Sequence, residues 1–156
     1  MHAEQFMNAQ VHVAHADELV RDVLARMRVE HLRMLPVLDD DHRIVGVLST
    51  FTVMEKIMPR YIVDGDLASA SYAPDIGVLS AHYHEIAAKP VGEVMDEHPL
   101  MVRPEDSLFS VAAALIQYGK HEFALVADQN ARLLGIIAAG DILNVLSDAS
   151  GEARDA

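Results

Sequence analysis

The sequence predicts a mixed α/β (α+β) protein in which one β-α-β-β-α unit occurs twice. The first observation is an internal repeat, because residues 13–57 align on residues 102–146 without a gap. The second is the order of hydrophobic patterns, which change between strand and helix spacing in the same succession in both copies. The third is composition, since 51% of the 156 residues are hydrophobic, enough for one compact domain with a core.

The first copy begins with a short extended piece at 11–13. A helix with an acidic start follows, and its apolar residues recur at helical spacing. These residues are Leu19, Val20, Val23, Leu24 and Met27. Apolar runs at 34–38 and 43–48 predict two strands, which the turn-prone aspartates at 39–41 separate. A last helix at 51–58 closes the unit.

The second copy repeats this layout after an extended piece at 101–103. Its first helix carries apolar residues at the same kind of spacing. These residues are Leu108, Val111, Ala112, Leu115 and Ile116. Strands are predicted at 123–127 and 132–137, with the turn-prone residues 128–130 between them. A helix at 141–146 ends the copy.

Each return strand carries a glycine in its middle, Gly46 in the first copy and Gly135 in the second. A missing side chain in a strand lets another backbone or a ligand come close. We expect packing within the fold to be the main reason at both positions. In the segments that precede the two copies, a shift of one residue pairs Met7 with Met95.

The charge is strongly acidic, with 24 acidic residues against 12 basic ones and a net charge of -12. This balance argues against a nucleic acid or an anionic membrane surface as partner. The absence of cysteine excludes disulfides and thiol catalysis and fits a reducing compartment. No apolar run approaches the length that a bilayer requires, and the first ten residues lack a signal-peptide pattern. We expect a soluble, cytoplasmic protein.

The residues at 35–39 (Leu-Pro-Val-Leu-Asp), those at 91–95 (Val-Gly-Glu-Val-Met) and the strand, glycine and helix that end each copy resemble a known family. It is the cystathionine beta-synthase (CBS) domain, which occurs in tandem pairs called Bateman modules. The resemblance implies a stand-alone CBS domain protein. A single unit is too small to bury much core, so we expect two CBS repeats packed sheet to sheet as one pseudo-symmetric module.

This resemblance divides the chain into a first CBS motif at 1–58 and a second at 89–147. Between them lies an inter-repeat segment at 59–88, whose tyrosines and aliphatic residues predict an ordered arm with a helix near 78–87. We favour an arm that covers the module's own surface over one that docks a partner. The small and polar residues 148–156 predict a flexible tail.

The resemblance also implies a nucleotide site at the end of each copy, since clefts between paired CBS units often bind an adenosine-containing ligand. The family's ending reads Gly, two apolar residues, Thr or Ser, two residues of any kind, and Asp. The aspartate can accept hydrogen bonds from both ribose hydroxyls, and the hydroxyl residue can donate to a phosphate. The first copy keeps the hydroxyl in Ser49 but has Thr52 in place of the aspartate; the second keeps Asp141 but has Ala138 in place of the hydroxyl.

We expect the nucleotide in the second cleft first, because the single hydroxyl of Thr52 cannot replace the paired acceptors of a carboxylate. The N–H groups of Gly140 and Asp141 at the helix start would offset the hydroxyl missing at Ala138 in part. The base would meet backbone near residues 100–101 and 122–123, which match the family's adenine contacts by location. The candidate nucleotide-binding residues are Asp141, Gly140, Ala138, Ile137, Met101, Leu100, Phe123, Glu122, Ser49, Thr50 and Thr52.

These residues also have a purely structural interpretation. Asp141, and Ser49 or Thr50, are ordinary helix N-cap residues that stabilise by about 1 kcal/mol. From the residues alone, both interpretations of Asp141 stay open, and Ser49 fits the cap better.

A metal site and catalysis are both disfavoured by the residue pattern. His82 and His84 are two apart, and no second pair with zinc-like spacing completes a site with them, even with His12 and His15. No phosphate-binding glycine loop and no nucleophile with an assignable base is present. We therefore predict no enzyme, no metal and no catalytic cofactor.

The resemblance implies a regulatory module that senses an adenine nucleotide (AMP, ADP or ATP) or an S-adenosylmethionine-like ligand. It would control a separate protein, such as a transporter or a metabolic enzyme. By family analogy two chains form a disc-like homodimer, and the small residues at 112–114 and 138–140 would permit close approach. The alternative is a dimeric scaffold with degenerate clefts that acts through protein contacts without nucleotide.

Overall fold

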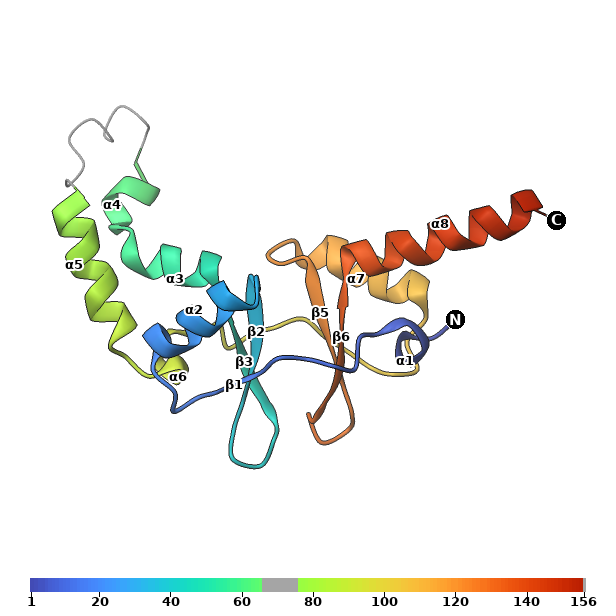
Figure 1. The fold of residues 1–156 in the computed structure, drawn as a ribbon, viewed down its shortest axis with the longest axis horizontal. Helices are drawn as coiled ribbons and strands as arrows, with labels where there is room; N and C mark the ends of the chain where they lie inside the picture. The colour runs from blue at the N-terminus through green and yellow to red at the C-terminus, as the bar shows by residue number, and fades with distance from the viewer. Residues whose placement is uncertain (66–75, 156) are drawn as a thin grey trace. The chain divides into compact units, whose positions relative to one another are not determined.

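The repeated β-α-β-β-α order is present in the computed structural model, which describes residues 1–65 and 76–155 (Figure 1). In chain order the elements are α1 (Ala3–Phe6), β1 (Ala14–His15), α2 (Val20–Val29), β2 (Met34–Leu38), β3 (Ile44–Ser49), α3 (Thr50–Ile57), α4 (Arg60–Val63), α5 (Ile76–Ala87), α6 (Val91–Val94), β4 (Met101–Val102), α7 (Leu108–Tyr118), β5 (Phe123–Ala127), β6 (Leu133–Ala138) and α8 (Ala139–Asp155). The predicted α/β fold class with two repeats is confirmed. No helix of the described residues is both long and apolar enough to cross a membrane.

Each repeat builds its own three-stranded sheet, in the orders β1-β2-β3 and β4-β5-β6. The first two strands of each sheet are parallel, and α2 or α7 makes the connection between them. A helical crossover is the usual way to join neighbouring parallel strands. β5 then pairs antiparallel with β6. Every residue of β2 is buried, so its continuous apolar run has partners on both faces.

The chain divides into two compact units over its described residues. The first-repeat unit contains Val13–Asp39 and Val45–Glu97, and the second-repeat unit contains Met1–His12, Asp40–Ile44 and His98–Ala156. Each unit has its own hydrophobic core. The segment that precedes each repeat in the sequence therefore packs into the unit of the other repeat.

The preceding segments join the edges of the two sheets in equivalent ways. Asn8 exchanges two backbone hydrogen bonds of 2.9 Å with Ile136, and Asp96 exchanges two of 2.9 Å with Val47. These bridges lie beside the strand glycines Gly135 and Gly46, respectively.

The two strand glycines leave room for methionines of these segments. A Cβ atom on Gly46 would lie 2.6 Å from the carbonyl oxygen of Asp96 and 2.7 Å from Sδ of Met95. A Cβ atom on Gly135 would lie 2.6 Å from Sδ of Met7. The prediction that these glycines serve packing is confirmed, and the pairing of Met7 with Met95 has a structural basis.

The structure shifts the alignment of the two copies by one residue in the part that precedes the second strand of each copy. Ala14 pairs with Val37, and Val102 pairs with Val126. Since Val37 and Val126 are equivalent, Ala14 is the counterpart of Val102, whereas the alignment places Val13 there. The gapless alignment is therefore wrong in this part of the chain.

The turns before the first helices show the same shift. The N–H of His15 donates to the carboxylate of Glu18, and the N–H of Arg103 donates to that of Asp106, at 2.8 and 2.9 Å. α7 has 11 residues and α2 has 10, so the second copy absorbs its additional residue in this helix. A one-residue change at a helix end leaves both flanking strands in place, which is why the sequence alignment did not reveal it.

Two predicted elements differ from the observed ones by three residues or more at one end, and the others by two at most. The short strand expected at 11–13 lies at Ala14–His15, because the end of β2 supplies its hydrogen-bonding partner. The helix expected at 141–146 runs from Ala139 to Asp155, and no proline follows Asp141 to end it earlier. The backbone of 148–155 is thus helical, while the flexibility of the tail stays a prediction.

The arm contains α4 and α5, and α5 packs against α2 and α3 in the first-repeat unit. Ala87 is buried, and Nδ1 of His82 lies 3.2 Å from the carbonyl oxygen of Ile57. The helix predicted near 78–87 is thus present as α5 and packs on the first-repeat unit, while the preference for covering the module over docking a partner stays a prediction. Residues 66–75 of the arm lie outside the described residues.

Candidate functional site

The start of α3 is closed by the two hydroxyl residues of the first copy. Ser49 is the N-cap, and its Oγ accepts a hydrogen bond of 2.9 Å from the N–H of Thr52. The two hydroxyl oxygens are also 2.9 Å apart and hydrogen-bonded. Both residues are buried, with 4% and 8% of their surface exposed. Ser49 is therefore a satisfied cap, as the residue pattern favoured, and Thr50 beside it is exposed.

The start of α8 has a different hydrogen bond at the same two positions. Oδ2 of Asp141 accepts a hydrogen bond of 2.8 Å from the N–H of Ala138. Ala138 is the residue before the helix, so Asp141 is its third residue. A side chain in that place that reaches back to the N–H before the helix forms one half of a capping box, and the cap hydroxyl forms the other half. The first copy keeps the hydroxyl half at Ser49, and the second keeps the carboxylate half.

The carboxylate of Asp141 retains acceptor capacity. Within the described part of the chain, its Oδ2 accepts one hydrogen bond and its Oδ1 accepts none. An ionised carboxylate has about four acceptor positions, so it could take two hydroxyl donors beside the helix-capping bond. Asp141 is half-buried, and a Cβ atom on its neighbour Gly140 would meet nothing within 4 Å. The backbone at the start of α8 is thus open to a ligand on the side of Gly140.

The other candidates of the second copy gather at one edge of its sheet. Since β4 and β5 are parallel and β6 is antiparallel to them, the starts of β4 and β5 meet the end of β6. Phe123 pairs with Ala138, and the N–H of Ala139 donates to the carbonyl oxygen of Glu122 at 3.0 Å. The structure therefore brings together eight of the predicted residues. They are Leu100, Met101, Glu122, Phe123, Ile137, Ala138, Gly140 and Asp141.

These eight residues differ in what they expose. Met101 is 43% exposed, and the side chain of Glu122 is exposed too. Ile137 is fully buried in the core of the second-repeat unit, so only its backbone could face a ligand. The carbonyl oxygen of Leu100 already accepts a hydrogen bond of 2.9 Å from Leu125. This end of the sheet can therefore offer a ligand mainly two things: an apolar contact with the side chain of Met101 and a hydrogen-bond acceptor in the carboxylate of Asp141.

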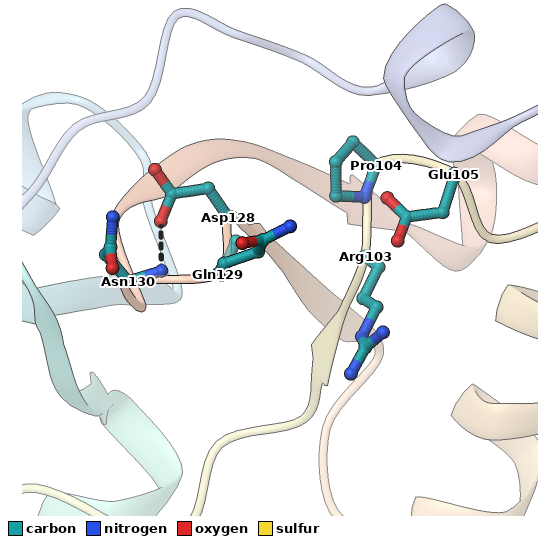
Figure 2. A pocket seen from close by; sticks show the side chains of 7 residues that line it. Arg103, Pro104, Glu105, Asp128, Gln129 and Asn130 are labelled. Atoms are coloured by element: carbon teal, nitrogen blue, oxygen red, sulfur yellow. Dashed lines mark hydrogen bonds between the residues drawn. The ribbon is translucent and has the colours of Figure 1, made fainter.

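A hollow of about 590 Å³ lies at the opposite end of β5, where sequence reasoning predicted only a turn (Figure 2). Its lining residues are Arg103, Pro104, Glu105, Ala127, Asp128, Gln129 and Asn130. Oδ1 of Asp128 accepts backbone hydrogen bonds from Asn130 and Arg132, at 2.8 and 3.0 Å. This carboxylate therefore shapes the turn, and the hollow does not include the residues at the start of α8.

The histidines were the other candidates for a ligand site. Among the described residues, no group of three or more His, Cys, Asp or Glu side chains could hold a metal ion. His82 contacts the backbone of α3, which gives it a structural contact within the first-repeat unit.

Comparisons with known proteins agree with this architecture. The CBS domain family model matches twice, at residues 3–59 and 91–148. The chain is 28% identical over 142 residues to "CBS domain-containing protein CBSX2, chloroplastic" of Arabidopsis thaliana, with 85% of this chain covered. The match spans 57% of the length of that relative.

Solved structures share the fold at lower identity. A crystal structure of Arabidopsis CBSX2 in complex with AMP has a TM-score of 0.72 at 23% identity, covering 96% of this chain and 98% of that chain. A CBS domain-containing protein from Bacillus anthracis has a TM-score of 0.74 at 17% identity, covering 95% and 94% of the two chains. Because the family model matches both repeats, the chain belongs to the CBS domain family.

Proposed function

We propose that this protein is a regulatory module that binds an adenine nucleotide at the start of α8 and thereby controls a separate protein. The observation that carries the proposal is the carboxylate of Asp141, which caps the helix with Oδ2 and accepts no bond with Oδ1 within the described chain. Two adjacent ribose hydroxyls are donors that suit such an acceptor. A ligand would shift the partner's activity only by the difference in its affinity for two states of the module.

The relatives support an adenine nucleotide as the ligand class. CBSX2 of Arabidopsis was crystallised in complex with AMP, and its fold resembles that of this chain over nearly its whole length. The exposed surface of Met101 offers an apolar contact for a base at the same sheet edge as Asp141. AMP is therefore the first ligand to test, followed by ADP, ATP and S-adenosylmethionine.

The test is isothermal titration of these four ligands into the protein and into its Asp141→Asn variant. An asparagine oxygen can still accept the hydrogen bond from Ala138, but its NH₂ group replaces the free acceptor. We expect one ligand to bind the original protein and to lose at least about tenfold in affinity in the variant, or about 1.4 kcal/mol.

Asp148→Asn is the matched control, because it removes the same charge from an exposed position on the same helix. We expect that variant to keep the affinity of the original protein. Equal affinity of the Asp141→Asn protein would move the ligand away from the start of α8. Absence of heat with all four ligands would reject the adenine nucleotide.

A scaffold without nucleotide is the second candidate, and the start of α3 favours it. Ser49 and Thr52 satisfy each other and are buried, so the first copy offers no free acceptor comparable to Asp141. If the second copy also binds no nucleotide, the module would act through protein contacts alone. Capture of the same partner by the original and the Asp141→Ala proteins, without added nucleotide, would support this function.

Several finer features of the proposal come from the family resemblance. They are a homodimer, a transporter or metabolic enzyme as the controlled protein, a regulatory and non-catalytic role, and a cytoplasmic location. The relative from Arabidopsis is chloroplastic, so localisation of a tagged chain is a direct test of the last feature.

A further inference from the structure

The hollow of about 590 Å³ lies between two turns, the one that follows β4 and the one that joins β5 to β6 (Figure 2). All of its lining residues belong to the second-repeat unit. Its volume is typical of sites that bind small molecules. The start of α8, where we place the nucleotide, follows the other end of β6, so the hollow is a separate place in the fold.

Backbone hydrogen bonds hold both walls of the hollow in place. The N–H of Glu4 donates to the carbonyl oxygen of Pro104 at 3.1 Å, so α1 supports the turn after β4. In the other turn, the N–H of Asp128 donates to the carbonyl oxygen of Arg132 at 3.0 Å. Walls that are fixed before a ligand arrives lower the ordering cost of binding.

The turns use two carboxylates for their own backbone and leave the other polar side chains of the hollow available. Asp106 accepts from the N–H of Arg103, and Asp128 accepts from two N–H groups of its turn. Four lining side chains form no hydrogen bond or ion pair with the described residues: those of Arg103, Glu105, Gln129 and Asn130. Glu105 and Gln129 extend into the hollow from opposite walls, and Arg103 lies at its edge (Figure 2).

The equivalent turns of the first repeat are much more acidic. In the shifted alignment the counterpart of Arg103 is His15. Residues 129–130 correspond to Asp40 and Asp41. The second repeat thus has two amides in place of two carboxylates, and an arginine in place of a histidine. In a chain with a net charge of -12, this difference makes the second repeat the one that suits a ligand with a carboxylate group.

We propose that this hollow binds a free α-amino acid with a polar, uncharged side chain. The ligand's ammonium group would donate to the carboxylate of Glu105, and its carboxylate would accept from the guanidinium of Arg103. The amides of residues 129–130 both donate and accept, which suits a side chain such as that of glutamine. Pro104 and Ala127 offer an apolar contact to the ligand's carbon atoms. The inference does not depend on nucleotide binding, so its tests and the titration at Asp141 can fail separately.

The first test is isothermal titration of the protein with L-glutamine, L-asparagine, L-serine and L-leucine. We expect L-glutamine to bind with a dissociation constant of about 1 mM or lower, and L-leucine to bind at least about tenfold more weakly. Absence of saturable binding by all three polar amino acids up to about 10 mM would overturn the proposal. Leucine binding as tightly as glutamine would overturn the role of the two amides.

Derivatives of the ligand test each of its charges in turn. N-acetyl-L-glutamine lacks the ammonium group and L-glutaminamide lacks the carboxylate, while both keep the side chain. Each should bind at least about tenfold more weakly than L-glutamine, because each loses one charge-assisted hydrogen bond. Full affinity of either derivative would contradict recognition of a free amino acid.

Variants of the protein test whether the amino acid binds in this hollow. Arg103→Gln and Glu105→Gln each change an exposed side chain, so both proteins should stay folded, which circular dichroism checks. We expect each to lose at least about tenfold in affinity for L-glutamine. The controls are Lys120→Gln for the first and Asp17→Asn, at the equivalent turn of the first repeat, for the second; both should bind like the original protein. Unchanged affinity in either hollow variant, or an equal loss in its control, would overturn the proposal.

Discussion

The first turns of α3 and α8 are built from the same two positions, yet they leave different groups available. In α3 the hydroxyls of Ser49 and Thr52 bond to each other, Oγ of Ser49 also accepts from the N–H of Thr52, and both residues are buried. In α8 the carboxylate of Asp141 bonds back to Ala138 with one oxygen and stays half-buried. Each turn keeps one half of a capping box. Capping by one oxygen of Asp141 thus leaves its other acceptors available, whereas the hydroxyls of α3 are used within the turn.

The two strand glycines should be equally important for stability, because both leave room for the segment that packs beside them. Gly46→Ala and Gly135→Ala each place a Cβ atom within 3 Å of the segment that joins the sheet edge. We expect each to lower the free energy of unfolding by about 2–3 kcal/mol, because overpacking forces backbone shifts. Urea unfolding measures this loss. Gly140→Ala is the control, since its Cβ atom would meet nothing within 4 Å, and a similar loss there would refute the packing explanation.

Loss of the cap hydroxyl should affect the first repeat strongly. Ser49→Ala removes the acceptor for the N–H of Thr52 and leaves the buried hydroxyl of Thr52 without its partner. We expect a loss of about 1–2 kcal/mol in the free energy of unfolding. Ser147→Ala, on the exposed surface of α8, should change it by less than about 0.5 kcal/mol. Equal stability of the Ser49→Ala protein would show that this cap is not needed.

Addition of the missing hydroxyl should make the second repeat resemble the first. In Ala138→Ser the new Oγ can accept from the N–H of Asp141 while Asp141 still accepts from residue 138, which completes a capping box. We expect a gain of about 0.5–1 kcal/mol in thermal or urea unfolding. A new donor beside the helix start should also tighten AMP binding relative to adenosine. Destabilisation by this change would show that the turn of α8 cannot adopt the geometry of α3.

An ion pair in the first repeat should have a smaller, pH-dependent effect on stability. Nη1 of Arg26 lies 2.9 Å from Oε1 of Glu18. Glu18 and its equivalent Asp106 both accept a backbone N–H, but the second repeat has Ala114 in place of Arg26. The hydrogen bond from Arg26 lowers the pKa of Glu18 below its usual 4.5. The folded state thus gains stability above pH 4.5 and loses it as the pH falls through the lowered pKa of Glu18.

Glu18→Gln should therefore cost stability at pH 7, and the difference from the original protein should shrink as the pH falls below about 4.5. Both side chains are about one third exposed, so we expect less than about 1 kcal/mol. Urea unfolding of both proteins between pH 7 and pH 4 tests this trend. A difference in unfolding free energy that grows toward low pH would contradict a lowered pKa of Glu18.

Much of the fold could be predicted from the sequence because the strands are short, apolar and bounded by turns. The strands at 34–38 and 123–127 have the predicted bounds, and Gly46 and Gly135 have the predicted packing role. The exchange of preceding segments between units could not be predicted, because it depends on backbone contacts between residues far apart in the chain, such as Asn8 and Ile136. The one-residue shift of the repeat was also hidden, since α7 absorbs it at its end.

The gathering of eight candidate residues at one end of the second sheet could be predicted from the sequence, and their hydrogen bonds could not. Residues at the start of β4, the start of β5 and the end of β6 gather as their strand order requires. The sequence did not decide whether Asp141 caps a helix or binds a ligand, and the structure gives it the capping bond with one oxygen left over.

The most direct test of nucleotide binding at the start of α8 is a ¹H–¹⁵N spectrum of the assigned protein during a titration with AMP. The N–H of Ala138 donates to the carboxylate that would hold the ribose, so its signal should report occupancy. Nucleotide binding at the start of α8 should give saturable shifts at Ala138, Gly140 and Asp141, with Ser49 and Thr52 unchanged. Shifts confined to Ser49 and Thr52, or saturable binding that leaves residues 138–141 unmoved, would contradict it.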